Sequence, residues 1–195
     1  MKIYLVRHTE SKAQTEEEFS LDANLSQFGE QQAKQLRQRL AQIQFDVTFL
    51  SPLKRARQTF ELSEVDCKDI YFDSRLAEEL PPGMYADNIL PYETTPSYAA
   101  VDIYNSWEVP ILDRLKLFWQ TVYALPEEST VLIVCHAGVL NWLLGLFLNP
   151  NMSDSDILNR PKCFMANGAL SVIEVNSDTQ NQLLTWNETE HLNLT

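Results

Sequence analysis

The segment IYLVRHTE, at residues 3–10, starts with a run of apolar residues and continues into an arginine–histidine pair. A second segment, VLIVCHAG at residues 131–138, has the same form, because its apolar run again leads into a histidine. Short, nearly continuous apolar runs are typical of strands that are buried on both faces of a parallel sheet. The chain has three histidines, and two of them follow such runs. We therefore predict two buried strands that each end at a histidine.

The remaining pattern alternates strands and helices along the chain. Ser26 is predicted to cap one helix, and the pair Ser51-Pro52 is predicted to cap and open another. Alternation of this kind predicts one α/β domain over residues 1–195, built as a three-layer α/β/α sandwich with a mainly parallel central sheet. Ligands of such folds bind at the carboxyl ends of the strands, where both histidines are expected. The predicted strands cover residues 3–6, 45–50, 70–72, 131–134, 170–175 and 183–186, the last two as an antiparallel pair, and the longer helices cover residues 29–43, 110–124 and 138–148.

The composition is that of a soluble globular protein, with 45% hydrophobic and 22% charged residues. The net charge of -12 argues against nucleic acid and an anionic membrane as partners, so an anionic substrate must be attracted by local cations. The longest apolar run, at residues 139–148, is about half of a membrane span, and from the first residues we expect no secretory leader. The three cysteines lack metal-ligand spacing, and we expect reduced thiols and a cytoplasmic location. The local cations that would attract an anionic substrate are Arg7, Lys54, Arg55 and Arg57.

The pairing of a histidine with a fixed cation is suited to chemistry at phosphorus. The imidazole of His8 is a nucleophile, and the guanidinium of Arg7 neutralises the oxygens that surround a phosphoryl group. The chain has only five glycines, and it lacks both the phosphate-binding loop of nucleoside triphosphatases and the dinucleotide fingerprint. It also lacks His-x-x-x-His and carboxylate clusters with ligand spacing. We therefore expect no cofactor and no metal ion.

Several motifs occur in an order that resembles the histidine phosphatase superfamily, also called the phosphoglycerate mutase-like family. They are RH at residues 7–8, SPLKRARQT at 51–59, RLAE at 75–78, VCHAGV at 134–139, NG at 167–168 and NETEHL at 187–192. Three positions depart from the usual pattern. Thr9 and Ala137 stand where glycine is commoner, and Cys135 stands where serine or threonine is commoner.

The resemblance implies a catalytic role for five residues. His8 would be the nucleophile and would carry a phosphohistidine intermediate. Arg7, Arg55 and His136 would hold the three non-bridging phosphoryl oxygens, with His136 acting best as a cation. Glu78 would protonate the leaving oxygen and then deprotonate the attacking water. The chemistry of phosphoryl transfer supports this division, since it requires charge neutralisation and alignment more than covalent steps.

Two of these assignments have a rival nearby in the sequence. Arg57 lies two residues after Arg55, and Glu79 follows Glu78 directly, although the family register favours Arg55 and Glu78. Gln14, six residues after His8, stands where relatives often carry asparagine. Its amide is expected to donate a hydrogen bond to a bound phosphate.

The segment at residues 80–109 is rich in proline and tyrosine and has no clear period. In the related family this region caps the active site, and here it lacks the usual Gly-x-x-Glu-Gly sequence. The resemblance implies a phosphomonoesterase that acts on a small phosphorylated metabolite, and the RHTE opening is similar to that of α-ribazole phosphatases. Sugar-phosphate and broad-specificity phosphatases fit nearly as well. A phosphoglycerate mutase and a catalytically silent phosphate-binding module are the alternatives, and a homodimer is one of the oligomeric states that the sequence allows.

Overall fold

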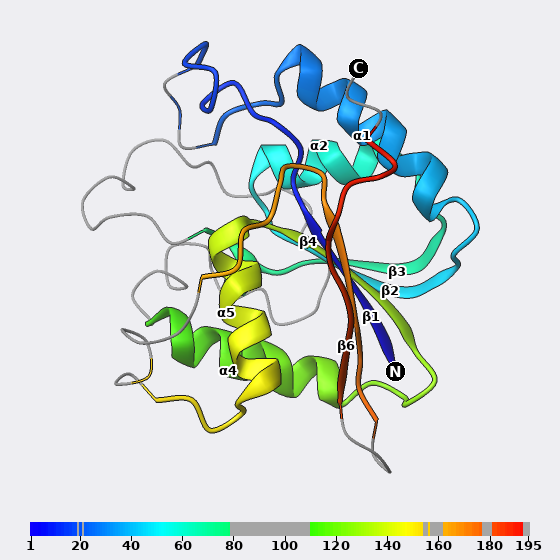
Figure 1. Ribbon diagram of the computed structural model, residues 1–195, viewed down its shortest axis with the longest axis vertical. Helices are drawn as coiled ribbons and strands as arrows, with labels where there is room; N and C mark the ends of the chain where they lie inside the picture. The colour runs from blue at the N-terminus through cyan, green and yellow to red at the C-terminus, as the bar shows by residue number, and fades with distance from the viewer. Residues whose placement is uncertain are drawn as a thin grey trace.

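A computed structural model describes residues 1–18, 20, 22–78, 110–153, 156, 162–176 and 181–192 of the chain. The predicted capping segment at residues 80–109 and the rival acid Glu79 lie outside the described residues. Within the described part, one six-stranded sheet separates two layers of helices (Figure 1). The prediction of a three-layer α/β/α sandwich is confirmed.

The sheet has the strand order β3-β2-β4-β1-β5-β6. The first four of these strands run parallel to one another, whereas β5 is antiparallel to β1, and β6 is antiparallel to β5. The predicted mainly parallel sheet and its closing antiparallel pair are therefore both confirmed. The strands are β1 (Lys2–Arg7), β2 (Phe45–Leu50), β3 (Cys67–Phe72), β4 (Thr130–Cys135), β5 (Leu170–Glu174) and β6 (Gln182–Glu188).

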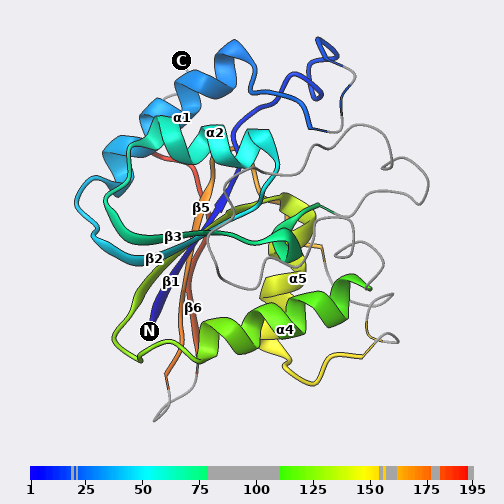
Figure 2. The ribbon, with the colours of Figure 1, turned by 180° about the vertical axis from the view of Figure 1, so that it is seen from behind.

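The two faces of the sheet carry separate hydrophobic cores because side chains alternate between the faces of a strand. Ile3 and Leu5 of β1 belong to the core beneath α4 (Ile111–Tyr123) and α5 (Ala137–Leu148), whereas Val6 belongs to the core beneath α1 (Gln27–Leu40) and α2 (Lys54–Ser63). Opposite views place α1 and α2 on one side of the sheet and α4 and α5 on the other (Figure 1 and Figure 2). A short 3₁₀ turn, η1 (Ser74–Leu76), follows β3. Among the described residues, none of the helices has the length and hydropathy to cross a membrane.

The start of α1 holds the chain that follows the first strand. Ser26 caps this helix as predicted, because its side chain accepts a hydrogen bond from the Gly29 backbone N–H. Gly29 lies directly on the backbone of Glu10, whose carbonyl oxygen a Cβ at this position would overlap. The segment after His8 thereby packs against the start of α1.

The predicted helix cap at Ser51 is wrong. The helix α2 begins at Lys54, its N-cap is Leu53, and no side chain caps it. The hydroxyl of Ser51 lies instead 2.7 Å from the imidazole of His136. Ser51 and Pro52 therefore form the turn between β2 and α2, and the serine side chain is used in the site described next.

Candidate active site

The two histidines of the apolar runs lie side by side. His8 follows β1 and His136 follows β4, and these strands are parallel neighbours with Arg7 paired to Cys135. The backbone N–H of His8 donates to the Cys135 carbonyl oxygen over 2.9 Å. The ring centroids of the histidines are 5.1 Å apart, and both rings are buried. The register of the two strands thus brings together residues that are far apart in the sequence.

The imidazole of His8 is held with one nitrogen available for reaction. Its Nδ1 lies 2.7 Å from the carbonyl oxygen of Thr9. Because a carbonyl oxygen only accepts hydrogen bonds, Nδ1 carries the proton and Nε2 keeps a lone pair. Burial, together with the positive charge of Arg55, lowers the pKa of His8 well below its ordinary value. The ring is therefore neutral at pH 7, as a nucleophile requires.

Arg55 connects the proposed nucleophile to the proposed acid. Its Nε donates to Nε2 of His8 over 3.3 Å, and its terminal nitrogen lies 2.7 Å from a carboxylate oxygen of Glu78. Arg57 instead forms an exposed ion pair with Glu61 one turn further along the same helix. Residues two apart on a helix point about 200° away from each other. For this reason α2 directs only one of the two arginines toward His8.

Glu78 lies between the cations and the second histidine. Its Oε2 is 3.7 Å from Nδ1 of His136, in addition to the contact with Arg55. The side chain is 33% exposed, whereas the His136 side chain is fully buried. A carboxyl group at the boundary of a buried site can exchange protons with both a leaving group and water.

The ligand-free site favours the uncharged form of His136, whereas the sequence predicts a cation that shares the charge of a bound phosphate. Burial lowers its pKa well below the ordinary value, and the charge of Arg55 lowers it further. Its Nε2 lies 2.7 Å from Ser51 Oγ. Among the described residues, its Nδ1 has no hydrogen-bond partner.

Arg7 is the last residue of β1, and described residues accept hydrogen bonds from only some of its guanidinium nitrogens. One of its terminal nitrogens donates to the Met165 carbonyl oxygen over 2.6 Å. Its Nε is buried, and no described residue accepts a hydrogen bond from it. Two buried groups, this Nε and Nδ1 of His136, are thus left without a partner in the described part of the chain. An anion that entered the site would offer acceptors of the kind that such groups require.

Gln14 is near the site but is bound to other side chains. Its amide nitrogen donates to Asn167 Oδ1 over 3.0 Å, and its oxygen accepts from the Ser11 backbone N–H over 3.1 Å. Asn167 in turn donates to the carbonyl oxygen of His8 over 3.1 Å. Gln14 therefore supports the backbone of the histidine through Asn167.

The site also contains a possible set of metal ligands that sequence spacing did not reveal. His8, Glu78 and His136 each offer a ligand atom, and these atoms all lie within 4.8 Å of one another. Arg55, however, makes hydrogen bonds to both His8 and Glu78. A guanidinium at these positions repels a divalent cation and attracts an anion. The donor set therefore fits a phosphoryl group better than a metal ion.

Ser51 belongs to the site, although the sequence pattern predicts it as a helix cap. A serine directly after a buried strand is ambiguous, because the same position can cap a helix or face the ligand-binding edge of the sheet. Its place at the start of the 51–59 motif, after a strand that belongs to the same parallel set, is the signal that could have identified it.

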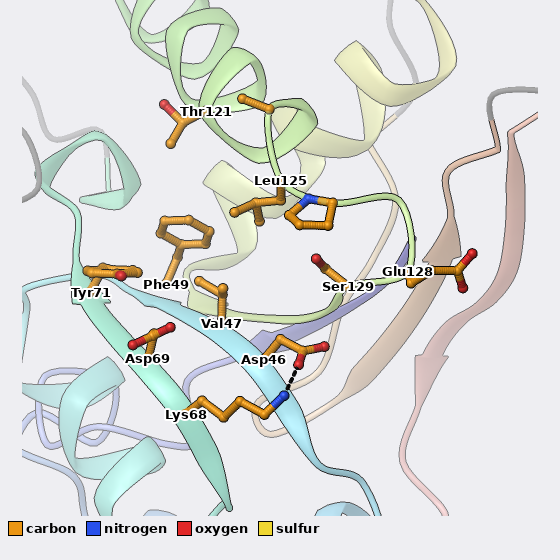
Figure 3. Close-up of a pocket in the computed structure, with 12 residues that line it drawn as sticks. Asp46, Val47, Phe49, Lys68, Asp69, Tyr71, Thr121, Leu125, Glu128 and Ser129 are labelled. Carbon is orange, nitrogen blue, oxygen red and sulfur yellow. Dashed lines mark hydrogen bonds and ion pairs between the residues drawn. The ribbon is translucent and has the colours of Figure 1, made fainter.

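A separate cavity of about 630 Å³ lies between β2, β3 and the end of α4. Figure 3 shows Phe49, Tyr71 and Leu125 around it, with an ion pair between Asp46 and Lys68 at its edge. Asp46 belongs to the amino-terminal half of its strand, whereas His8 and His136 follow the carboxyl ends of theirs. The cavity is lined by none of the predicted site residues, so it is distinct from the histidine site.

Comparison with known proteins gives a consistent result. A model of the histidine phosphatase superfamily (branch 1) matches residues 3–81 and 106–189. A probable phosphatase of Schizosaccharomyces pombe is 27% identical over 98% of this chain and 95% of its own length. A probable phosphoglycerate mutase of Shigella dysenteriae, GpmB, is 30% identical over 76% of this chain and 75% of its own. The crystal structure of a putative alpha-ribazole-5'-P phosphatase from Escherichia coli matches with a TM-score of 0.69 at 21% identity, covering 96% of this chain and 97% of that one.

Proposed function

Because the chain belongs to the histidine phosphatase superfamily and is a phosphatase enzyme, we propose that it hydrolyses a small phosphomonoester through a phosphohistidine on His8. The observation that carries this proposal is the double contact of Arg55. One guanidinium touches both the nucleophilic nitrogen of His8 and the carboxylate of Glu78. A phosphoryl group that replaces these contacts would meet the nucleophile, the acid and the neutralising charge together.

In the first step the substrate phosphate takes over the hydrogen bonds of Arg55. Nε of Arg7 and Nδ1 of His136, which lack partners among the described residues, bind further phosphoryl oxygens. Nε2 of His8 then forms a bond to phosphorus as the bond to the leaving oxygen breaks. The electron pair goes to that oxygen, which receives a proton from the carboxylic acid form of Glu78, and Glu78 is left as a carboxylate. The alcohol departs and leaves a phosphohistidine.

In the second step Glu78 works as a base. Its carboxylate removes a proton from a water molecule, whose oxygen attacks phosphorus as the P–N bond breaks. The electron pair returns to Nε2 of His8, which regains its neutral form, and inorganic phosphate leaves. The partial exposure of Glu78 supports this role, because water reaches the carboxyl group from solvent.

The substrate that we propose first is α-ribazole phosphate. Two observations support this choice, the RHTE opening of the sequence and the likeness of the fold to the putative alpha-ribazole-5'-P phosphatase. We further propose that residues 80–109 form a capping excursion of a single domain over residues 1–195 and select the alcohol part of the ester. The free cysteines of the described chain support a reducing, cytoplasmic location.

A phosphoglycerate mutase is the second candidate, and the similarity to GpmB favours it. A mutase must keep its phosphohistidine away from water until the second alcohol returns. The partly exposed acid of this chain favours transfer to water instead.

A release assay distinguishes these functions. The purified chain is incubated with α-ribazole phosphate, phosphoserine, phosphoglycerates, sugar phosphates and nucleotides, and inorganic phosphate is measured with His8→Ala as the blank. We expect His8-dependent release, fastest with α-ribazole phosphate. Isomerisation of phosphoglycerate without release would favour the mutase. The absence of turnover on the whole panel would favour a silent phosphate-binding module.

A further inference from the structure

Ser51 and His136 form a buried pair at the edge of the sheet. The strand β2 lies parallel to β4 with Leu50 opposite Val134, and the Ser51 backbone N–H donates to the Val134 carbonyl oxygen over 2.9 Å. This register places the serine beside the histidine. Both residues have no exposed surface, and Ser51 Oγ lies 2.7 Å from Nε2 of His136. A contact this short between buried polar groups is a hydrogen bond, and its loss would leave a buried polar group unsatisfied.

The direction of this hydrogen bond determines what the other ring nitrogen presents to the site. A neutral imidazole has one N–H group and one lone pair. If the hydroxyl of Ser51 donates to Nε2, the proton of His136 sits on Nδ1. If Nε2 donates to the hydroxyl, Nδ1 presents a lone pair.

The surroundings favour donation by the serine. The Leu53 backbone N–H approaches Ser51 Oγ at 3.4 Å, so the hydroxyl oxygen already serves as an acceptor. On the other side of the ring, Nδ1 of His136 lies 3.7 Å from a carboxylate oxygen of Glu78. A lone pair on Nδ1 would face this carboxylate and, in the complex, a phosphoryl oxygen. An N–H group on Nδ1 would attract both.

We propose that Ser51 is a positioning residue that holds His136 as the tautomer protonated on Nδ1, so that the uncharged ring donates a hydrogen bond to a phosphoryl oxygen. This inference rests on the proposed function, and it explains how His136 assists in its neutral form. Without the hydroxyl, His136 reliably presents an Nδ1–H group only when the ring is protonated on both nitrogens. Loss of the Ser51 hydroxyl should therefore lower kcat at high pH and have less effect at low pH.

The kinetic test compares Ser51→Ala with the wild-type enzyme from pH 5.5 to pH 8.5 on an ester that the wild type hydrolyses. We expect kcat of the variant to be lower by about tenfold to a hundredfold at the alkaline end, the effect of one hydrogen bond to a charged group. The ratio of variant to wild-type kcat should rise toward one as the pH falls, because protonation restores the donor. The ratio cancels the titrations that both enzymes share. A ratio that stays constant with pH would overturn the proposal.

A matched control and a rescue variant accompany this test. Ser63 is also buried, and its hydroxyl donates to the Phe60 carbonyl oxygen at the far end of α2. Ser63→Ala should leave the ratio independent of pH. Ser51→Thr keeps a hydroxyl and should restore much of the alkaline activity.

A spectroscopic measurement on the wild type tests the tautomer even if Ser51→Ala fails to fold. The two ring nitrogens of ¹⁵N-histidine have different chemical shifts according to which one is protonated, and His136→Asn identifies the signals. We expect a protonated Nδ1 and an unprotonated Nε2 at pH 7.5. A protonated Nε2 would overturn the proposal. The absence of activity on every ester, with the expected tautomer, would overturn the proposed function and leave the position of the proton established.

Discussion

Arg55 donates a hydrogen bond from its Nε to Nε2 of His8 over 3.3 Å, while the same guanidinium binds Glu78. The nucleophilic nitrogen is therefore engaged before a substrate arrives. A dianionic phosphate is a stronger acceptor for a guanidinium than a neutral imidazole is. Binding of the substrate would thus release the lone pair of His8 at the position where phosphorus must lie.

The first prediction concerns Arg55 itself. Arg55→Lys should lower kcat/KM by about a hundredfold, because an ammonium group cannot contact His8, Glu78 and a phosphoryl oxygen in the planar geometry of the guanidinium. Arg57→Lys is the control and should have little effect, since Arg57 forms an exposed pair with Glu61. Steady-state kinetics on the best ester provide the measurement. Equal losses in both variants would contradict the assignment.

The second prediction concerns the covalent intermediate. His8→Ala should lower kcat by about a thousandfold or more, as the loss of a nucleophile does in other enzymes. Rapid quenching of the wild type with ³²P-labelled substrate should trap a phosphoenzyme that is stable in base and labile in acid. A variant with substantial remaining activity, or a wild type that traps no label, would argue that water attacks the substrate directly.

The third prediction concerns the acid. Glu78→Gln should slow hydrolysis of alkyl phosphates by about a hundredfold to ten-thousandfold, because no group remains to protonate the leaving oxygen. The loss should be much smaller with p-nitrophenyl phosphate, whose leaving group needs little protonation. Glu79→Gln serves as the control and should be nearly neutral. If Glu79→Gln showed this large loss and Glu78→Gln did not, the catalytic acid would be Glu79.

The fourth prediction concerns stability at low pH. Burial lowers the pKa of His8 and His136 well below 6.5, so the folded state holds both rings neutral where the unfolded chain binds protons. The unfolded state then carries more protons below about pH 6.5, and stability must fall as the pH falls. Urea unfolding should give a free energy that is constant near pH 7.5 and decreases toward pH 5.5. Replacing His136 with asparagine should flatten this dependence, and a slope equal to that of the wild type would count against a buried neutral ring.

The fifth prediction concerns metal ions. Dialysis against EDTA should leave the turnover number unchanged, because Arg55 supplies positive charge among His8, Glu78 and His136, where a metal would bind. Added Zn²⁺ should inhibit, since it would compete with the phosphoryl group for the same atoms. Loss of activity in EDTA that one metal ion restores would show that the three residues act as ligands.

Local pattern alone predicted most of the secondary structure. The strand at residues 45–50 was predicted with the bounds that β2 has, and the run at 131–134 lies within β4. The predictions for these segments are correct because a strand that is buried on both faces needs consecutive apolar residues, and this pattern is visible in the local sequence alone. The cap at Ser26 was also correct, since a capping bond joins residues only three apart.

By itself the sequence determined which residue types stand at the ends of buried strands. It therefore determined that His8 and His136 lie at the edge of the sheet where ligands bind. Only the tertiary structure decided which groups meet there. The register of β2, β4 and β1 sets Ser51 beside His136 and His136 beside His8, and the rotation of α2 turns Arg55 inward and Arg57 to solvent. Contacts of this kind depend on strand pairing and helix orientation, which are properties of the packed chain. For the same reason the serine looked like a helix cap in the sequence, yet in the folded chain its hydroxyl binds a histidine 85 residues away.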